Sequence, residues 1–155
     1  MCDSKHRTLL NACNEGDKTK LIVALAEFFT VDNYVVFSEI VYRKSGDGLL
    51  HVLARYGHID CLSLLLMEWD GRDHVNIEQR NLDGKTALHE AAQSSQGETV
   101  KLLLSAGAKV DQLKRADWTP LMLAVTKVGN VDVVRHLTEA GADLHLANKG
   151  LLPFL

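Results

Sequence analysis

The stretch DGKTALHEAA, residues 83–92, decides the fold because its pattern returns further along the chain. ADWTPLMLA occupies residues 116–124, so that Thr119 follows Thr86 by 33 residues. Two upstream stretches fit the same pattern less closely: GLLHVLARYGHIDCLSLLL at 48–66 and TLLNACNEGDKTKLIVAL at 8–25. A fixed period of this length is typical of repeat proteins, in which each unit packs mainly on its neighbours.

Each repeat predicts a helix, a turn and a second helix. Thr86 and Thr119 are expected to begin first helices, since a threonine hydroxyl can accept from an unpaired backbone N–H. Apolar residues three and four apart, such as Val100 and Leu104, predict the second helix, and Gly107 is expected to end it. The predicted single domain covers 1–155 and divides into 8–47 with an insertion, 48–82, 83–115, 116–149 and a divergent tail at 150–155.

Composition excludes several classes of function. A net charge of −3 argues against direct nucleic-acid binding as the main role, and no apolar run is long enough to predict a membrane span. The three cysteines form no CxxC pair and no signal peptide is recognisable, which favours a reducing compartment, cytoplasmic or nuclear. No cofactor is expected.

These motifs resemble the ankyrin repeat family. The resemblance is carried by Thr86-Ala87-Leu88-His89-Glu90-Ala91-Ala92, by Thr119-Pro120-Leu121, and by the leucine runs at 64–66 and 102–108. It implies an all-α ankyrin-repeat solenoid of about four helix-turn-helix units with short hairpin-like turns. It also implies structural roles for the following repeat-motif residues: His51, Thr86, Leu88, His89, Ala91, Ala92, Thr119, Pro120 and Leu121.

A zinc site is the competing interpretation of His89, because HEAAQ at 89–93 is one residue away from a zinc-protease signature. Gln93 stands where the second histidine would be, and Met122 fills the equivalent of His89 in the next unit, so no metal and no catalytic residue are predicted. The resemblance implies instead that His89 and His51 bond into the neighbouring turn. Glu90 is expected to face outward, as a surface carboxylate or a partner contact.

Trp118 and its neighbours form the predicted partner surface, in the turn that leads into the last unit. Either Trp118 is an exposed binding residue, or its ring packs locally on Pro120 or on the neighbouring turn. The charges around it, joined by Arg80, form either a basic ridge or scattered solubilising charge. The candidate partner-binding residues are Trp118, Asp117, Arg115, Lys114, Lys85, Glu90 and Lys149.

LKRADWTPLMLA at 113–124 and LHEAA at 88–92 are also similar to the ankyrin repeat domain-containing protein 16 family. That resemblance implies a co-regulator of alanyl-tRNA synthetase that limits serine mischarging, with turn lysines as acceptors. Lys149 matches one such position; Arg115 departs from another, since a guanidinium stays protonated, and the adjacent Lys114 is the substitute. GLLPFL after Lys149 replaces the start of a further repeat, which suggests a short or truncated form.

Two functions therefore stay open. The first is a non-catalytic scaffold that binds another protein through repeat turns and concave first-helix faces. The second is the synthetase co-regulator, with an aminoacyl-tRNA synthetase as partner. Weak self-association through the apolar C-terminal end is also expected, as is a buried loop or strand at 28–37.

Overall fold

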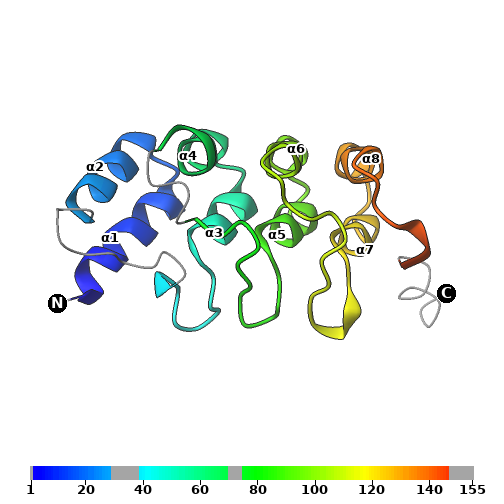
Figure 1. Ribbon diagram of the computed structural model, residues 1–155, viewed down its shortest axis with the longest axis horizontal. Coiled ribbons are helices and arrows are strands. Elements are labelled where there is room, and N and C mark those ends of the chain that lie inside the picture. The colour runs from blue at the N-terminus through cyan, green and yellow to red at the C-terminus, as the bar shows by residue number, and fades with distance from the viewer. Residues whose placement is uncertain (1, 29–38, 70–74, 147–155) are drawn as a thin grey trace.

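The computed structural model describes residues 2–28, 39–69 and 75–146, and stacks helix pairs side by side in two layers (Figure 1). The first layer holds the first helix of each pair: α1 (Cys2–Glu15), α3 (Leu49–Tyr56), α5 (Ala87–Gln93) and α7 (Pro120–Val125). The second layer holds the partner helices: α2 (Lys18–Phe28), α4 (Ile59–Ser63), α6 (Gly97–Ser105) and α8 (Val131–Glu139). The predicted all-α solenoid is confirmed.

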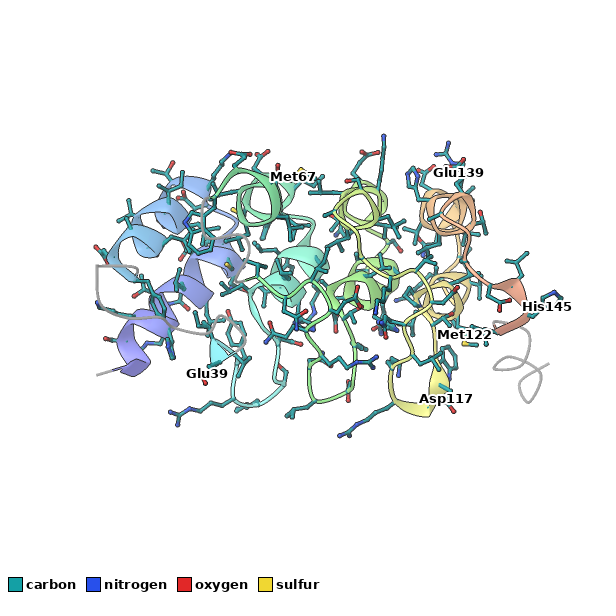
Figure 2. The ribbon with its side chains drawn as sticks, in the orientation of Figure 1. Glu39, Met67, Asp117, Met122, Glu139 and His145 are labelled. Atoms are coloured by element: carbon teal, nitrogen blue, oxygen red, sulfur yellow. The ribbon has the colours of Figure 1, made fainter. Side chains whose placement is uncertain are left out.

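Three finger turns leave the first layer on the same side of the molecule (Figure 1). We refer to residues 39–48, 75–86 and 108–119 as the first, second and third finger turns. Each ends where a first helix begins. Figure 2 shows Glu39 and Asp117 on this side and Met67 and Glu139 at the opposite edge. The third finger turn contains a short 3₁₀ helix, η4 (Arg115–Asp117).

The apolar core runs continuously from α1 to α8. Its largest fully buried apolar side chains are Leu9, Leu21, Ile40, Leu53, Leu62, Leu65, Leu88, Leu103, Leu137 and Val100. Ala91, Ala92 and Ala124 are also fully buried, where first helices pack against each other. Larger side chains there would overpack the stack, at a typical cost of about 1–3 kcal/mol.

Local signals explain where the helices begin and end. Thr119 Oγ1 accepts from the Met122 backbone N–H at 3.2 Å, and Pro120 occupies the first helical position, where it loses no hydrogen bond. Gly57 ends α3 in the left-handed conformation at a φ of 68°. Gly107 follows α6 at a φ of 94°, as the sequence predicts.

Two helices differ from the sequence prediction. The first repeat stretch begins at Thr8, but α1 begins at Cys2, so Thr8 lies inside the helix, where its hydroxyl donates to the Ser4 carbonyl at 3.0 Å. The second helix of the next pair does not stay α-helical, because α4 continues as a π-helix, η2 (Leu64–Glu68). Phe28, the first residue of the loop or strand predicted at 28–37, is instead the last residue of α2. The rest of that segment and the tail at 150–155 lie outside the described part of the chain.

A polar side chain at the start of each of three second helices reaches back to the preceding pair. His58 Nε2 lies 3.1 Å from the Asn14 carbonyl, Gln96 Nε2 3.3 Å from that of Arg55, and Asn130 Nδ2 3.2 Å from that of Ala92. Those three carbonyls belong to the C-terminal ends of α1, α3 and α5. Last-turn carbonyls have no partner within the helix, so the contact satisfies them and joins neighbouring pairs.

Candidate protein-binding surface

The tips of the finger turns stack on each other through their backbones. Leu82 N–H donates to the Ser45 carbonyl at 2.9 Å, and Arg115 N–H donates to that of Asp83 at 3.1 Å. These contacts align Lys44, Leu82 and Arg115 at one position of successive turns. We call these three residues the tip row. Lys44 and Arg115 are exposed, and Leu82 is 55% exposed.

His51 and His89 lie buried between a first helix and the next finger turn. The Nδ1 atom of His51 accepts from the Gly48 N–H at 3.0 Å, so its proton sits on Nε2, which lies 2.8 Å from the Lys85 carbonyl. His89 repeats the arrangement, with Nδ1 3.1 Å from Thr86 N and Nε2 3.1 Å from the Trp118 carbonyl. Both imidazoles thus bond into the neighbouring turn in the neutral form.

Burial explains the protonation state of these histidines. Desolvation lowers the pKa of His89 to about 4, against the weaker opposing effect of its hydrogen bond to Trp118. Desolvation likewise lowers the pKa of His51. In the next unit Met122 stands in place of the histidine. Its Sδ accepts from the Thr119 N–H at 3.3 Å, which replaces the bond that the Nδ1 of His89 accepts.

Glu90 is not an outward-facing carboxylate, which corrects the sequence prediction. It is 3% exposed, and its Oε2 accepts from Arg55 Nε at 3.0 Å. Arg55 also donates from Nη2 to Asp47 Oδ2 at 2.7 Å, and Asn81 Nδ2 donates to Asp47 Oδ1 at 2.7 Å. The Glu90 carboxylate is therefore part of an ionic network that joins α3, α5 and two finger turns.

The charges in this network stabilise one another. The hydrogen bond that Arg55 donates to Glu90 raises the pKa of Arg55. Burial alone would raise the pKa of Asp47, but hydrogen bonds from Asn81 and Arg55 outweigh it and hold that pKa below its usual value.

Lys85 is likewise no surface lysine, contrary to its predicted place on a partner surface. Its side chain is only 13% exposed, and Nζ lies 3.4 Å from Glu90 Oε1 and 2.6 Å from Gln93 Oε1. Arg80, the other cation of the predicted ridge in this turn, donates to the Leu113 carbonyl and to Gln112 Oε1 of the next turn. Lys85 thus joins its turn to α5, and Arg80 joins two finger turns while its side chain stays exposed.

Trp118 is partly buried and packs against the core, which favours local packing over a fully exposed ring. Its carbonyl accepts from the Lys114 backbone N–H at 2.9 Å, closing the turn. Lys114 is half-buried, with Nζ 3.3 Å from the Arg115 carbonyl, whereas Arg115 and Asp117 are exposed. Lys149 lies outside the described residues.

The remaining repeat-motif residues are buried and build the stack. They are Thr86, Leu88, Ala91, Ala92, Thr119, Pro120 and Leu121. Thr86 Oγ1 lies 3.0 Å from His89 Nδ1. The motif thus orders the interfaces, and the candidate binding groups stand at the finger tips.

Neither a metal-ligand group nor a membrane-spanning helix is found among the described residues. No group of three or more His, Cys, Asp or Glu side chains there is placed to hold a metal ion. No described helix has the length and apolarity to cross a bilayer. Cys13 and Cys61 are buried free thiols, and burial raises the pKa of both, the opposite of nucleophilic activation.

Sequence reasoning missed Asp47, Arg55 and Asn81, the residues that bind Glu90 and one another. The available signal was the repeat alignment itself, which puts Asp47 at the position of Lys85 and Trp118. Asp47 is acidic at this position, and Arg55 lies on α3, the helix that begins directly after the turn. Together they indicate an ion pair close to the neighbouring unit. The residues directly before three second helices were also missed, although the same alignment would have shown them: His58, Gln96 and Asn130.

Stacked helix pairs with projecting finger turns define a repeat solenoid, a class of protein that presents extended surfaces. The family model for ankyrin repeats, in three copies, matches residues 2–114 and 50–148. The chain belongs to the ankyrin repeat family.

Curated relatives agree with this family over part of their length. The chain is 45% identical over 74 residues to protein phosphatase 1 regulatory subunit 27 of Homo sapiens, covering 48% of this chain and 47% of the relative. It is 37% identical over 99 residues to ankyrin repeat and SOCS box protein 11 of Mus musculus, covering 64% and 28%. It is 30% identical over 131 residues to the B-cell lymphoma 3 protein homolog of Mus musculus, covering 76% and 29%. The matches span about half or less of these relatives' own lengths.

Proposed function

We propose that the chain is a non-catalytic protein-binding scaffold whose partner lies along the finger turns and the adjoining first helices. The observation that carries the proposal is that the repeat-motif side chains are buried in contacts, whereas the side chains at the finger tips are exposed. Three motif side chains, those of His51, His89 and Glu90, bond between units, and the Lys85 side chain is paired with Glu90 of its own unit. The tip row, by contrast, presents Lys44, Leu82 and Arg115 to solvent.

The tip row has the composition of a recognition surface. An apolar side chain flanked by two cations can bury apolar area at its centre and orient a partner by charge at its rim. The backbone bonds between the tips hold these side chains at fixed spacing, which reduces the ordering cost on binding. One relative is named a regulatory subunit of protein phosphatase 1, which agrees with a binding role in a larger assembly.

Site-specific photo-crosslinking tests the proposal. A benzophenone amino acid replaces Leu82 on the tip row in one variant and exposed Lys101 on α6 in the matched control. In cells that express the intact chain, we expect discrete crosslinked proteins from position 82 and none of these from position 101. Equal labelling from both positions would contradict a partner surface on the finger side.

Cytoplasmic or nuclear residence is part of the proposal. The buried thiols of Cys13 and Cys61 agree with a reducing compartment.

The synthetase co-regulator hypothesis gains no support from the described lysines. A lysine acceptor must reach an adenylate as a free amine, yet Lys85 is paired with Glu90 and Lys114 is half-buried against its own turn. None of the relatives reported above is named for a synthetase. We therefore do not propose it as a second function.

A further inference from the structure

Ser45 lies at the tip of the first finger turn, directly after Lys44 of the tip row. Its carbonyl accepts from the Leu82 N–H at 2.9 Å, and its Oγ accepts from the Asp47 N–H at 3.2 Å. The residue is half-buried, yet it lines a hollow of about 320 Å³ together with Lys44, Asp47 and Arg55. Residue 45 therefore borders open space next to two cations and a carboxylate.

The charge at this turn position differs from one unit to the next. The backbone bonds between the tips place Ser45 in register with Asp83 and Ala116, the residues that follow the next two members of the tip row. The second finger turn thus already carries an anion at this position. Two residues further on, the second turn has Lys85, whereas the first turn has Asp47. A negative charge at 45 would therefore be followed by a carboxylate, where the charge at 83 is followed by a cation.

Asp47 is the residue that such a charge would affect most. Its side chain is 3% exposed and accepts from Arg55 Nη2 at 2.7 Å and from Asn81 Nδ2 at 2.7 Å. A hydrogen bond from Ser45 also acts to lower the pKa of Asp47. Arg55 in turn donates to Glu90 on α5 at 3.0 Å. An added anion beside this network would repel Asp47 and compete for Arg55.

The sequence around Ser45 favours phosphoryl transfer to its hydroxyl. Arg43 and Lys44 precede it directly. Protein kinases select their substrates partly by charge pattern, and a kinase with an acidic cleft selects a serine that follows cations. The substrate segment enters such a cleft in an extended form, so recognition depends on the sequence and not on the contacts of the folded turn.

Two other hydroxyls that follow cations are held inside helices. Thr8 follows Arg7 on α1, and Thr138 lies three residues after Arg135 on α8. Extending either segment would unwind a helix that packs in the core. Ser45 lies outside the helices, and a turn of this kind opens locally at a lower free energy than a packed helix. Among these three hydroxyls, the fold therefore favours Ser45.

We propose that Ser45 is a phosphorylation site, and that its phosphate loosens the junction between the second and third helix pairs. The γ-phosphoryl group of ATP passes to Ser45 Oγ. The bond from its phosphorus to the ADP oxygen breaks, the bond to Oγ forms, and the hydroxyl proton passes to a base of the kinase. The phosphate, with a charge of about −1.5 to −2 at pH 7, repels the Asp47 carboxylate and draws Arg55 away from Asp47 and Glu90. This regulation goes beyond the scaffold function, because it acts on the stability of the stack.

Phosphopeptide mapping of the intact chain by mass spectrometry tests the site. One sample is purified from cells treated with a phosphatase inhibitor, and a second is incubated with ATP and the catalytic subunits of protein kinases A and C. We expect phosphate on Ser45 in both samples, and phosphate there in either one supports the site. Absence of phosphate from Ser45 in both samples, with or without labelling of Thr8 or Thr138, overturns it.

A chain with phosphoserine encoded at position 45 tests the consequence. Its melting temperature should fall by about 2 °C or more relative to the unmodified chain. Phosphoserine at exposed Ser95, just before α6, is the matched control and should not lower it, because a helix N-terminus favours an anion. The loss at position 45 should shrink between about pH 7.5 and pH 5.5, since the second pKa of the phosphate is about 6.

Two comparisons separate the effect of charge from that of size. Phosphoserine at 45 should lower the melting temperature less in an Asp47→Asn background, where the repelled charge is absent. In the native background, Ser45→Asp should melt below Ser45→Asn, which differs from it in charge but hardly in size.

The loosening is overturned by equal losses at positions 45 and 95, by an unchanged or raised melting temperature with phosphoserine at 45, or by equal melting of Ser45→Asp and Ser45→Asn. The crosslinks from position 82 are an independent measurement, so failure of this inference is distinguishable from failure of the scaffold function.

Discussion

Arg55 and Glu90 meet across the interface of α3 and α5, with Nε 3.0 Å from Oε2 in a site where the carboxylate is almost fully buried. The pair belongs to two different repeats. It therefore contributes to joining the second helix pair to the third.

Glu90→Gln should destabilise the protein by about 2 kcal/mol. Removing one partner leaves the others without compensation, but Arg55 is 33% exposed, which keeps the cost below that of a fully buried pair. Urea unfolding monitored by circular dichroism measures the change. Glu98→Gln at an exposed site on α6 is the control, with an expected effect within about 0.5 kcal/mol. Equal effects at both sites would contradict a stabilising network.

Acid should weaken the fold between about pH 6.5 and pH 4. Burial holds the pKa of His89 at about 4 in the folded chain, whereas an exposed histidine has a pKa near 6.5. The unfolded state therefore binds more protons in this window, and stability falls as the pH falls, by roughly 3 kcal/mol for this residue once pH 4 is reached. His51 acts in the same direction.

His89→Met provides the control for the pH effect, because Met122 occupies the same position in the next unit. We expect a lower stability at pH 7 and a shallower decline between pH 7 and 4.5, measured by urea unfolding at several pH values. An unchanged pH slope in this variant would show that His89 titrates alike in both states.

Thr99→Val should stabilise the protein by about 1 kcal/mol. Thr99 is 1% exposed on α6, and its hydroxyl has no hydrogen-bond partner among the described residues. A buried hydroxyl without a partner costs free energy, and valine has nearly the same shape. Buried Cys61 and Val133 fill the equivalent sites of neighbouring units.

Thr119→Val makes the same chemical change with the opposite expected sign. Its hydroxyl caps α7 by accepting from Met122 N–H, so the variant should lose about 1 kcal/mol. Thermal melts of both variants measure whether the two changes in stability have opposite signs. Destabilisation by Thr99→Val would indicate that its hydroxyl is satisfied.

Asp117→Gly should also stabilise the third finger turn, by about 1 kcal/mol. Asp117 has a φ of 59°, in the left-handed region that is strained for residues with a side chain. The equivalent Gly84 adopts a φ of 73°. Gly84→Asp is the reciprocal variant and should destabilise, because its Cβ would lie 3.2 Å from the Arg115 backbone nitrogen. If both variants raised the melting temperature, or both lowered it, this account of the turn would be wrong.

The repeat pattern was sufficient to predict the fold and the buried motif. His51 and His89 share one place in the repeat, so the same backbone carbonyl of the next turn faces each of them. The burial of Ala91 and Ala92 follows equally from close packing of first helices. These features depend on local geometry that the repeat length fixes.

Glu90 was misplaced because part of its surroundings comes from another repeat, and Lys85 was misplaced because its side chain turns back onto Glu90 and Gln93 of its own repeat. Helical periodicity shows which face a residue occupies, but not that Arg55 from the preceding pair covers that face. Trp118 was uncertain for a similar reason, since its burial depends on what the third finger turn packs against. Surface exposure in a stacked array is a property of two units, whereas the sequence pattern describes one.

The polar contacts at the helix starts have a mechanical consequence. Between α3 and α5 and between α5 and α7, the pairs are joined at both ends of the first helix, by His51 to Lys85 with Gln96 to Arg55, and by His89 to Trp118 with Asn130 to Ala92. Between α1 and α3, the bonds from Tyr42 to Leu10 and from His58 to Asn14 lie one turn apart on α1. A unit that pivots about one end must break the bond at the other. The array should therefore resist pulling and twisting as a stiff spring does, with little freedom to fold at a single hinge.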